Sequence, residues 1–309
     1  MGRYLVNRIW HGLIVIFGVT AIVFVVTRLV GDPVSVMLPI DAPAAQRAQF
    51  SHDLGFDRPL AAQFGDFLVD SARLDFGQSM WQRRPAMEIV REKLPATLQL
   101  VFLGIVAALV LAVPIGVLAA MTPGGRLDKA ATLISLLGLS MPQFWLGLVL
   151  IYVLAVRLHW LPTSGIGTPA HLVMPVITMA LPALARLVMT VRSAMIEELS
   201  KQYVKVALAK GLPMTRVVAV HGLRNAAVPV LTIAGWELIR GLAGYSVVVE
   251  TVFAWPGLGL TAVQAISRHD LFLLQAVVFT VAAMVVVTNI ILDCLYQLFD
   301  PRLRLGGPA

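Results

Sequence analysis

Six long apolar runs constrain this chain more than any other feature of its sequence. A helix needs about 20 apolar residues to cross the hydrocarbon core of a bilayer, and each run is long enough. Hydrophobic residues make up 58% of the chain and charged residues only 13%, whereas soluble domains have about 25% charged residues. The sequence therefore predicts an all-α polytopic membrane protein with six transmembrane helices. The runs occupy roughly residues 9–30, 96–121, 131–156, 172–192, 228–249 and 271–298.

The positions of Lys and Arg predict the side of the membrane on which each loop lies. The short loops and tails on one side carry twelve of these residues, and the short loops on the other side carry two, Arg157 and Arg268. Because cytoplasmic loops hold the excess of Lys and Arg, both termini are predicted to be cytoplasmic. The basic residues lie in short segments between apolar runs, so the net charge of +7 does not indicate a nucleic-acid partner. The twelve are Arg3, Arg8, Arg126, Lys129, Arg192, Lys201, Lys205, Lys210, Arg216, Arg224, Arg302 and Arg304.

The predicted organisation has four parts. Residues 1–30 form a cytoplasmic N-terminus and an uncleaved first span, and residues 31–95 form an extracytoplasmic segment. Residues 96–298 form a five-helix membrane core that includes a long cytoplasmic loop at 193–227, and residues 299–309 form a cytoplasmic tail. We expect the segment 31–95 to pack on the outer ends of the spans, a role that is compatible with docking an extracytoplasmic partner.

Several kinds of catalytic chemistry have no sequence signature here. No Gly-Lys dipeptide occurs, so there is no Walker A loop to hold ATP phosphates. His-Glu-x-x-His and Gly-x-Ser-x-Gly are also missing, the six histidines are scattered, and Cys294 is the single cysteine. We therefore predict a protein with no catalytic residues, no metal site and no cofactor bound by this chain.

A few ionisable residues lie inside the apolar runs, where charged groups are usually functional. Glu237 and Arg240 are three residues apart on one helix face, so they can neutralise each other, either as a packing pair or along a water-filled path. Gln143 is a further candidate for the path, beside Pro142, which should kink the third run. Arg186 is expected to extend towards the cytoplasmic interface.

The cytoplasmic loop 193–227 has a clear local pattern. The stretch from Tyr203 to Lys210 predicts a short helix, Gly211 is placed for a left-handed C-cap, and Pro213 prevents continuation. A second short helix is expected from Met214 to 227, before Pro229 starts the fifth span. The alternatives are a helix resting on lipid and a helix that contacts a partner protein, and the small residues at the bend favour the partner.

This loop resembles the EAA loop of the membrane permeases of ABC importers. Ala207 and Gly211 match the motif, while Lys205 replaces its usual acidic residue. That departure is typical of the dipeptide/oligopeptide/nickel branch. The pattern of this branch is similar to the stretch from Tyr203 to Leu212. Further strings similar to this branch run along the whole chain: Leu54-Gly-Phe-Asp-Arg-Pro-Leu60, Leu74-Asp-Phe-Gly-Gln-Ser79, Leu94-Pro-Ala-Thr-Leu98, Ser140-Met-Pro-Gln-Phe-Trp145, His221-Gly-Leu-Arg-Asn-Ala226, Glu250-Thr-Val-Phe-Ala-Trp-Pro-Gly-Leu-Gly259 and Asp300-Pro-Arg302.

The resemblance implies a permease with the fold of type I ABC importers in the bacterial plasma membrane. Its expected partners are a second homologous permease in a heterodimer, two ABC ATPases that bind ATP and Mg, an extracytoplasmic solute-binding protein, and membrane lipid. The expected substrates are di- and oligopeptides, with nickel chelates or glutathione as alternatives within the family and an ion-coupled carrier or channel as an alternative of another class. The residues implied to contact the ATPases are Tyr203, Lys205, Ala207, Ala209, Lys210, Gly211, Leu212, Arg224 and Asn225.

Overall fold

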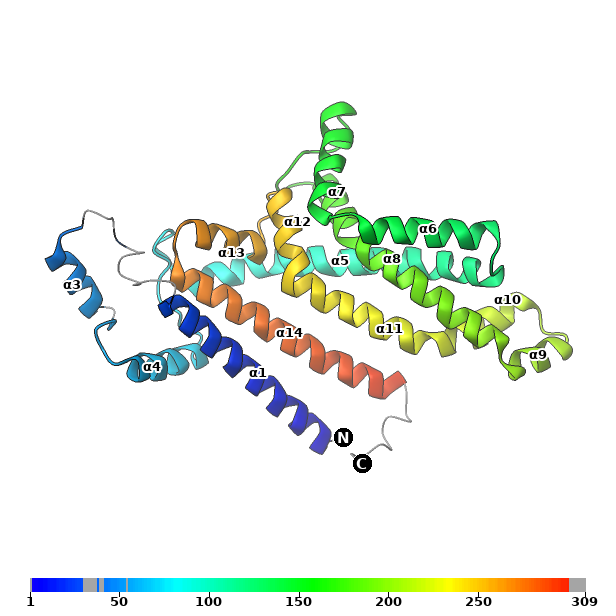
Figure 1. Cartoon of the computed structure of the whole chain (residues 1–309), viewed down its shortest axis with the longest axis horizontal. Helices are drawn as coiled ribbons and strands as arrows, with labels where there is room; N and C mark the ends of the chain where they lie inside the picture. Colours follow the sequence, from blue (N-terminus) through cyan, green and yellow to red (C-terminus); the bar gives the residue numbers. More distant parts are fainter. Residues whose placement is uncertain (1, 30–37, 39–41, 54, 300–309) are drawn as a thin grey trace. The chain divides into compact units, whose positions relative to one another are not determined.

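A computed structural model describes residues 2–29, 38, 42–53 and 55–299, and these residues form helices with no β-strand among them (Figure 1). The chain divides into two compact units. One unit combines the residues up to Thr97 with Pro256–Ile290, and the other combines Leu98–Trp255 with the residues from Ile291 onward. The predicted tail from 300 to 309, with Asp300-Pro-Arg302, and residues 30 and 54 lie outside the described residues.

The first unit contains two long apolar helices and several shorter ones. Both α1 and α14 are long and apolar enough to cross a membrane. The remaining helices of the unit come from the segment between the first two spans and from the stretch before α14. Its helices are α1 (Gly2–Leu29), α3 (Ala44–Asp53), α4 (Leu60–Ala72), the beginning of α5 (Ala86–Met121), α13 (Leu258–Ser267) and most of α14 (Leu271–Phe299).

Aromatic side chains attach the predicted outer segment to the spans of this unit. Phe24 of α1 lies against Phe64 and Phe67 of α4, with ring centroids 5.1 and 5.7 Å apart. Phe76, in the loop after α4, lies 5.1 Å from Phe279 of α14. Ring pairs at these distances stabilise packing beyond their buried area. The expectation that this segment packs on the spans is therefore confirmed for α4 and the loop that follows it.

Asp270 ties the turn between α13 and α14 to the segment before α5. Its Oδ2 accepts hydrogen bonds from the Ser79 hydroxyl at 2.5 Å and from the Trp81 N–H at 3.2 Å. Its Oδ1 accepts the Leu273 N–H at 3.1 Å, which satisfies a free donor in the first turn of α14. Asp270 and Ser79 are each 1% exposed, so water does not compete for these bonds.

The second unit contains the remaining helices and three short π-helical segments. The longest of its helices, α8, packs against α6, α7 and α11. The elements are the rest of α5, α6 (Arg126–Ser140), α7 (Gln143–Leu150), η1 (Ile151–Arg157), α8 (Ala170–Ser200), α9 (Gln202–Ala209), α10 (Met214–Arg216), η2 (Val217–Gly222), α11 (Leu223–Arg240), η3 (Gly241–Tyr245) and α12 (Ser246–Val252).

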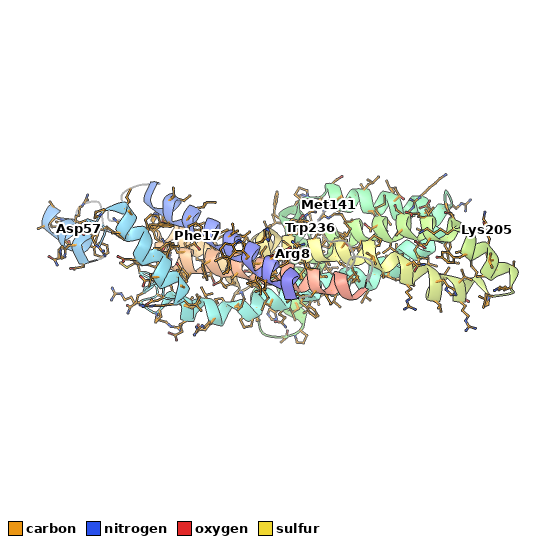
Figure 2. The ribbon with its side chains drawn as sticks, turned by 90° about the horizontal axis from the view of Figure 1, so that it is seen from below. Arg8, Phe17, Asp57, Met141, Lys205 and Trp236 are labelled. Atoms are coloured by element: carbon orange, nitrogen blue, oxygen red, sulfur yellow. The ribbon has the colours of Figure 1, made fainter. Side chains whose placement is uncertain are left out.

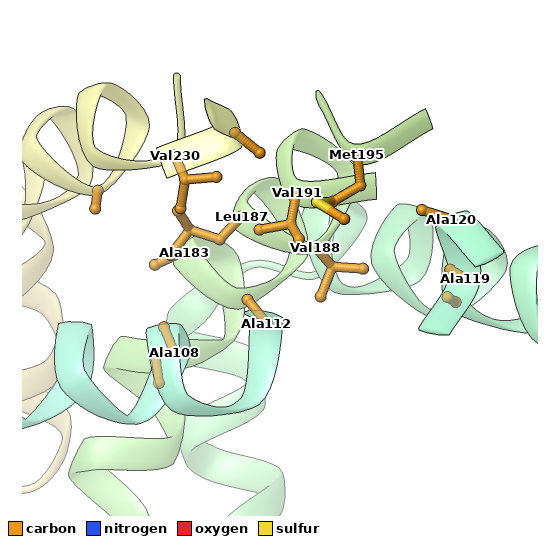
Figure 3. Close-up of a cluster of buried hydrophobic side chains, with 14 of the residues drawn as sticks. Ala108, Ala112, Ala119, Ala120, Ala183, Leu187, Val188, Val191, Met195 and Val230 are labelled. Carbon is orange, nitrogen blue, oxygen red and sulfur yellow. The ribbon is translucent and has the colours of Figure 1, made fainter. Parts of the chain in front are cut away.

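A row of small residues lets α5 approach α8 closely. These residues recur every fourth position on one buried face of α5, and Figure 3 shows Ala108 and Ala112 of that row below Leu187 and Val188 of α8. A Cβ atom on Gly116 would lie 2.6 Å from the Cβ of Val191, so only glycine fits there. Membrane helices lack a hydrophobic drive to associate, and small residues compensate by allowing close backbone packing. The row is Gly104, Ala108, Ala112 and Gly116.

The third apolar run bends sharply at Pro142. The ring of a proline removes an N–H and keeps the preceding residue out of the helical conformation. Met141 accordingly has ψ 125°, α6 ends at Ser140, and α7 begins at Gln143 at an angle of 100° to α6. The predicted kink is confirmed. The third apolar run, predicted over 131–156, is therefore a pair of helices joined at this bend rather than one continuous helix.

This bend also changes the number of spans. Among the described residues, five helical stretches are long and apolar enough to cross a membrane, and a sixth exists only if the bent pair counts as one span. The five stretches are Val6–Thr27, Ala86–Met121, Ala170–Ser200, Met214–Val252 and Leu271–Leu295.

Two helices start earlier than the sequence suggested. The helix of the second span begins at Ala86 rather than near residue 96. The helical stretch of the fifth span begins at Met214, so Pro229 lies inside α11 instead of starting the span, and the short helix expected from 214 to 227 is its first part. Proline is tolerated inside membrane helices because neighbouring groups and local adjustments satisfy the freed carbonyl.

Candidate functional site: the 193–227 loop and an ionic cluster

The loop predicted at 193–227 is largely helical. The helix α8 continues to Ser200, α9 follows after Lys201, and the helical stretch of the fifth span begins at Met214. Only a few residues separate these helices. Figure 2 shows Lys205 at the far end of the second unit and Trp236 nearer its middle, so α9 forms the tip of this unit.

The predicted C-cap at Gly211 is confirmed. Gly211 has φ +83°, a left-handed conformation that costs other residues about 1 kcal/mol or more. The Gly211 N–H donates to the Leu208 carbonyl at 2.9 Å, and the Leu212 N–H donates to the Ala207 carbonyl at 3.2 Å. Pro213 then leads into α10, as its missing N–H allows. Apart from its two chain neighbours, no atom in the described part of the chain lies within 4 Å of a Cβ placed on Gly211, so space is free beside this turn.

Most residues implied to contact the ATPases are on the surface of this tip. One side chain of α9, that of Val204, is buried at 2% exposure and holds the helix to the rest of the unit. The other side chains of α9 are exposed or half-buried. The exposed candidates are Lys205, Ala209, Lys210, Gly211, Arg224 and Asn225, and the half-buried candidates are Tyr203, Ala207 and Leu212.

A buried carboxylate, Glu198, fixes the base of the tip. Its side chain is 12% exposed. Its Oε1 accepts a hydrogen bond from the Lys201 ammonium, and its Oε2 accepts one from the Tyr203 hydroxyl at 2.8 Å and one from the Asn225 amide at 3.3 Å. The same amide donates to the Tyr203 oxygen at 3.2 Å. Glu198 thus connects the end of α8 with α9 and the beginning of α11.

Two of the groups that donate hydrogen bonds to Glu198 have a raised pKa. Burial and the hydrogen bond to Glu198 raise the pKa of the Tyr203 phenol. The hydrogen bond to Glu198 also raises the pKa of the Lys201 ammonium. A neutral Tyr203 and a charged Lys201 therefore belong to the folded tip.

The predicted pair of Glu237 and Arg240 is part of a larger cluster. Arg240 Nη1 lies 3.2 Å from Glu237 Oε1, as the spacing suggested. Arg186 does not extend to the interface as expected, because it binds the same carboxylate through two bonds: Nε to Oε1 at 2.5 Å and Nη2 to Oε2 at 2.8 Å. Arg186 Nη2 also donates to the Tyr245 hydroxyl at 3.1 Å. The Glu237 side chain is 1% exposed, so burial strengthens all of these contacts.

The third candidate for the path, Gln143, lies at the start of α7, directly after the bend at Pro142. Its amide nitrogen is buried and has no hydrogen-bond partner in the described part of the chain. A buried amide without a partner costs free energy, so this group is available to an incoming acceptor.

A further ion pair connects α6 with α8. Arg192 donates to both carboxylate oxygens of Asp128, with Nη2 at 2.8 Å from Oδ2, and Asp128 Oδ2 also accepts the Gly124 N–H at 2.8 Å. The Asp128 side chain is 4% exposed and that of Arg192 is 23% exposed. From the sequence, Arg192 is predicted to be one of the basic loop residues, and no role is predicted for Asp128.

Residues 112–305 match the family described as "Binding-protein-dependent transport system inner membrane component". This match covers well over half of the sequence. The chain belongs to this family. This match confirms the family resemblance of the loop. The chain is therefore a permease, a multi-pass membrane subunit of an ABC importer.

Its relatives match it over nearly their whole length. The oligopeptide transport system permease protein AppB of Bacillus subtilis (strain 168) is 36% identical over 98% of the permease and 100% of the relative. The dipeptide transport system permease protein DppB of Escherichia coli (strain K12) is 33% identical, and the glutathione transport system permease protein GsiC of the same strain is 34% identical. Both alignments cover 98% of the permease and 99% of the relative.

The fold is also similar to that of a solved transporter. An inward-facing structure of the MetNI methionine ABC transporter aligns with 69% of the permease and 97% of its own chain, with a TM-score of 0.60 at 22% identity. The predicted all-α fold of a type I ABC importer permease is thereby confirmed.

Sequence reasoning missed two residues that the structure brings into these sites, Glu198 and Tyr245, and it missed the partner of Arg186. Arg186 was recognised as an intramembrane charge, but its partner is 51 residues away. No helical spacing connects such residues. A signal did exist for Glu198, since an acidic residue at the end of an apolar run needs a partner, and Tyr203 lies five residues further on.

Proposed function

We propose that this permease is one of two homologous permease subunits of an ATP-driven importer of di- and oligopeptides in the bacterial plasma membrane. The observation that carries this proposal is the similarity to an oligopeptide and a dipeptide permease over 98% of the chain. The two subunits enclose a central path as a heterodimer. Both termini lie in the cytoplasm, as the distribution of Lys and Arg predicts.

The tip formed by α9 and the turn at Gly211 is the proposed contact with the ATPases. Its exposed small residues and its open glycine corner support this role, because a partner backbone can approach them closely. In this mechanism, ATP binding draws the two ATPases together, and their movement pushes the tip. The helices then change from an inward-open to an outward-open arrangement, and the extracytoplasmic binding protein releases its ligand into the path.

ATP and Mg are bound by the partner ATPases in this proposal, and the permease itself needs no cofactor. The sequence supports this division of labour because it contains no Walker A loop. The permease supplies the path and the surface on which force acts.

A second candidate substrate is glutathione, because one relative at 34% identity is named as a glutathione permease. Glutathione is itself a small peptide, so both candidates need a path for a flexible, charged solute. A nickel chelate is the remaining alternative within the family.

Uptake by a strain that lacks only this permease tests the substrate. Labelled dipeptide, longer peptide, glutathione and nickel are supplied separately, and a plasmid copy of the permease serves as the control. We expect peptide uptake to be lost and then restored by the plasmid. Loss of glutathione or nickel uptake, with peptide uptake unchanged, would replace peptides by that alternative.

A further inference from the structure

The cluster around Glu237 carries more positive than negative charge. Arg186 and Arg240 contribute two positive charges, and Glu237 contributes one negative charge. Arg186 uses Nε and Nη2 to hold both oxygens of the carboxylate, so this bidentate pair is complete by itself. Arg240 adds a single, longer contact through Nη1 at 3.2 Å. The excess positive charge of the cluster is therefore that of Arg240.

Arg240 is also the exposed member of the cluster. Its side chain is 49% exposed, against 26% for Arg186 and 1% for Glu237. Trp236 lies one helical turn earlier on the same face of α11 and is 55% exposed. The contact with Glu237 thus holds the Arg240 guanidinium in place beside an exposed aromatic ring.

The depth of Arg240 determines what its exposed side can face. It lies within Met214–Val252, a helical stretch long and apolar enough to cross a membrane, and inside the apolar run 228–249 that the sequence predicts as the fifth span. A guanidinium at this depth costs several kcal/mol when it faces lipid, so residues of this kind face a water-filled cavity or an oppositely charged partner. The exposed face of Trp236 and Arg240 is therefore turned towards the path or towards another protein group.

We propose that Arg240 binds the carboxylate of the transported peptide within the membrane. The inference rests on the proposed function, since it takes peptides as the substrate. Every peptide with a free C-terminus carries a carboxylate, which matches the planar donors of a guanidinium. Because Glu237 already neutralises Arg186, it balances half of the positive charge of the cluster, and a single carboxylate completes the balance. Trp236 supplies an apolar surface for the adjacent side chain of the peptide.

Uptake of two substrates, compared between the wild-type permease and one variant, tests this proposal. The complete importer is reconstituted with a binding protein that has been shown to bind both a tripeptide and its C-terminal amide. Uptake of both compounds is measured for the wild type and for Arg240→Gln. Because the same binding protein delivers both compounds, its own preference cancels when the acid-to-amide ratio of the variant is divided by that of the wild type.

We expect Arg240→Gln to lower uptake of the free acid about tenfold and to leave uptake of the amide nearly unchanged. Arg240→Lys should retain part of the preference, because it keeps the charge but not the bidentate geometry. Arg126→Gln is the matched control, since Arg126 is exposed at the start of α6, and it should leave both rates unchanged. An unchanged acid-to-amide ratio in Arg240→Gln would overturn the proposal.

Two other outcomes have separate meanings. If Arg240→Gln no longer co-purifies with the second permease, Arg240 pairs with an acidic residue of that subunit, and the proposal is wrong. If the wild type transports neither compound although the importer hydrolyses ATP, the proposed peptide substrate has failed, and the binding of a carboxylate by Arg240 fails with it. If only the proposed role of Arg240 is wrong, the wild type still takes up the peptide, so the two failures are distinguishable.

Discussion

The Tyr203 hydroxyl donates a hydrogen bond to Glu198 Oε2 at 2.8 Å, and this bond joins α9 to the end of α8. The Lys201 ammonium and the Asn225 amide bind the same carboxylate, so one buried group receives donors from three segments. A force applied to α9 therefore reaches α8 and α11 through Glu198. We regard this carboxylate as the positioning residue of the tip.

Removing the charge of Glu198 should loosen the tip without unfolding the permease. Glu198→Gln keeps the shape of the side chain but weakens the bonds from Lys201 and Tyr203, because a neutral amide oxygen accepts hydrogen bonds less strongly than a carboxylate does. We expect normal abundance in the membrane, weaker co-purification of the ATPases and uptake reduced several-fold. Tyr203→Phe, which loses a single donor, should show a smaller decrease. Equal uptake by Glu198→Gln and the wild type would contradict the positioning role.

The ionisation of Tyr203 gives a second prediction. Burial and the bond to Glu198 raise its pKa, so the fold favours the neutral phenol. Its contribution to stability is therefore fully present below the pKa of an unfolded tyrosine, about 10, and is lost as the pH rises through the higher pKa of the folded tip. The tyrosinate absorbance of the wild type minus that of Tyr203→Phe should have its midpoint above 10. A midpoint at or below 10 would show that the bond to Glu198 is absent in solution.

Substitutions at Gly211 separate the conformation of the turn from contact with a partner. Asparagine tolerates the left-handed conformation, and apart from the two chain neighbours no atom of the described residues lies within 4 Å of the added Cβ, so Gly211→Asn should fold normally. We expect it to lower co-purification of the ATPases, because its side chain occupies the open corner. Gly211→Val should do the same and should also strain the turn. Gln202→Ala, at the exposed start of α9, is the control and should behave as the wild type.

Single-cysteine variants test which side of the membrane each segment occupies. In a Cys294→Ser background, Asp57→Cys and Gln202→Cys place one exposed thiol in the segment before α4 and one in α9. An impermeant thiol reagent added to spheroplasts should label Asp57→Cys, while Gln202→Cys should react only after the membrane is opened. The reverse pattern would invert the proposed orientation.

The pair of Asp128 and Arg192 should contribute to stability rather than to transport. Asp128→Asn leaves the partly exposed guanidinium of Arg192 without its charged partner, so it should destabilise the packing of α6 on α8. The melting temperature of the purified importer should fall, with the transport rate per folded molecule unchanged. A loss of transport without a loss of stability would give this pair a functional role.

The sequence predicted features that depend on local spacing. Apolar runs identified the spans, Gly211 and Pro213 identified the turn, and Pro142 identified the bend. These signals work because the conformation of a few adjacent residues determines each feature. The angle of the bend and the interior position of Pro229 did not follow, because packing against neighbouring helices decides whether a proline ends a helix.

The ionic contacts show the same limit. The spacing of three residues predicted the contact between Glu237 and Arg240, whereas Arg186 reaches Glu237 from another helix. Such pairings depend on how α8 and α11 pack, and one sequence does not encode this in any periodic pattern. Glu237 is therefore neutralised by Arg186, and Arg240 remains the exposed charge of the cluster.

In the proposed mechanism, ATP hydrolysed by partner subunits drives peptide through this permease. The most direct measurement is the uptake of a labelled peptide into vesicles that contain the complete importer, with the binding protein outside, ATP inside and an ionophore that removes all ion gradients. We predict uptake that requires ATP, persists with the ionophore and disappears in Gly211→Val at equal abundance. Peptide uptake by this permease alone, driven by a pH gradient without ATP or ATPases, would contradict this mechanism.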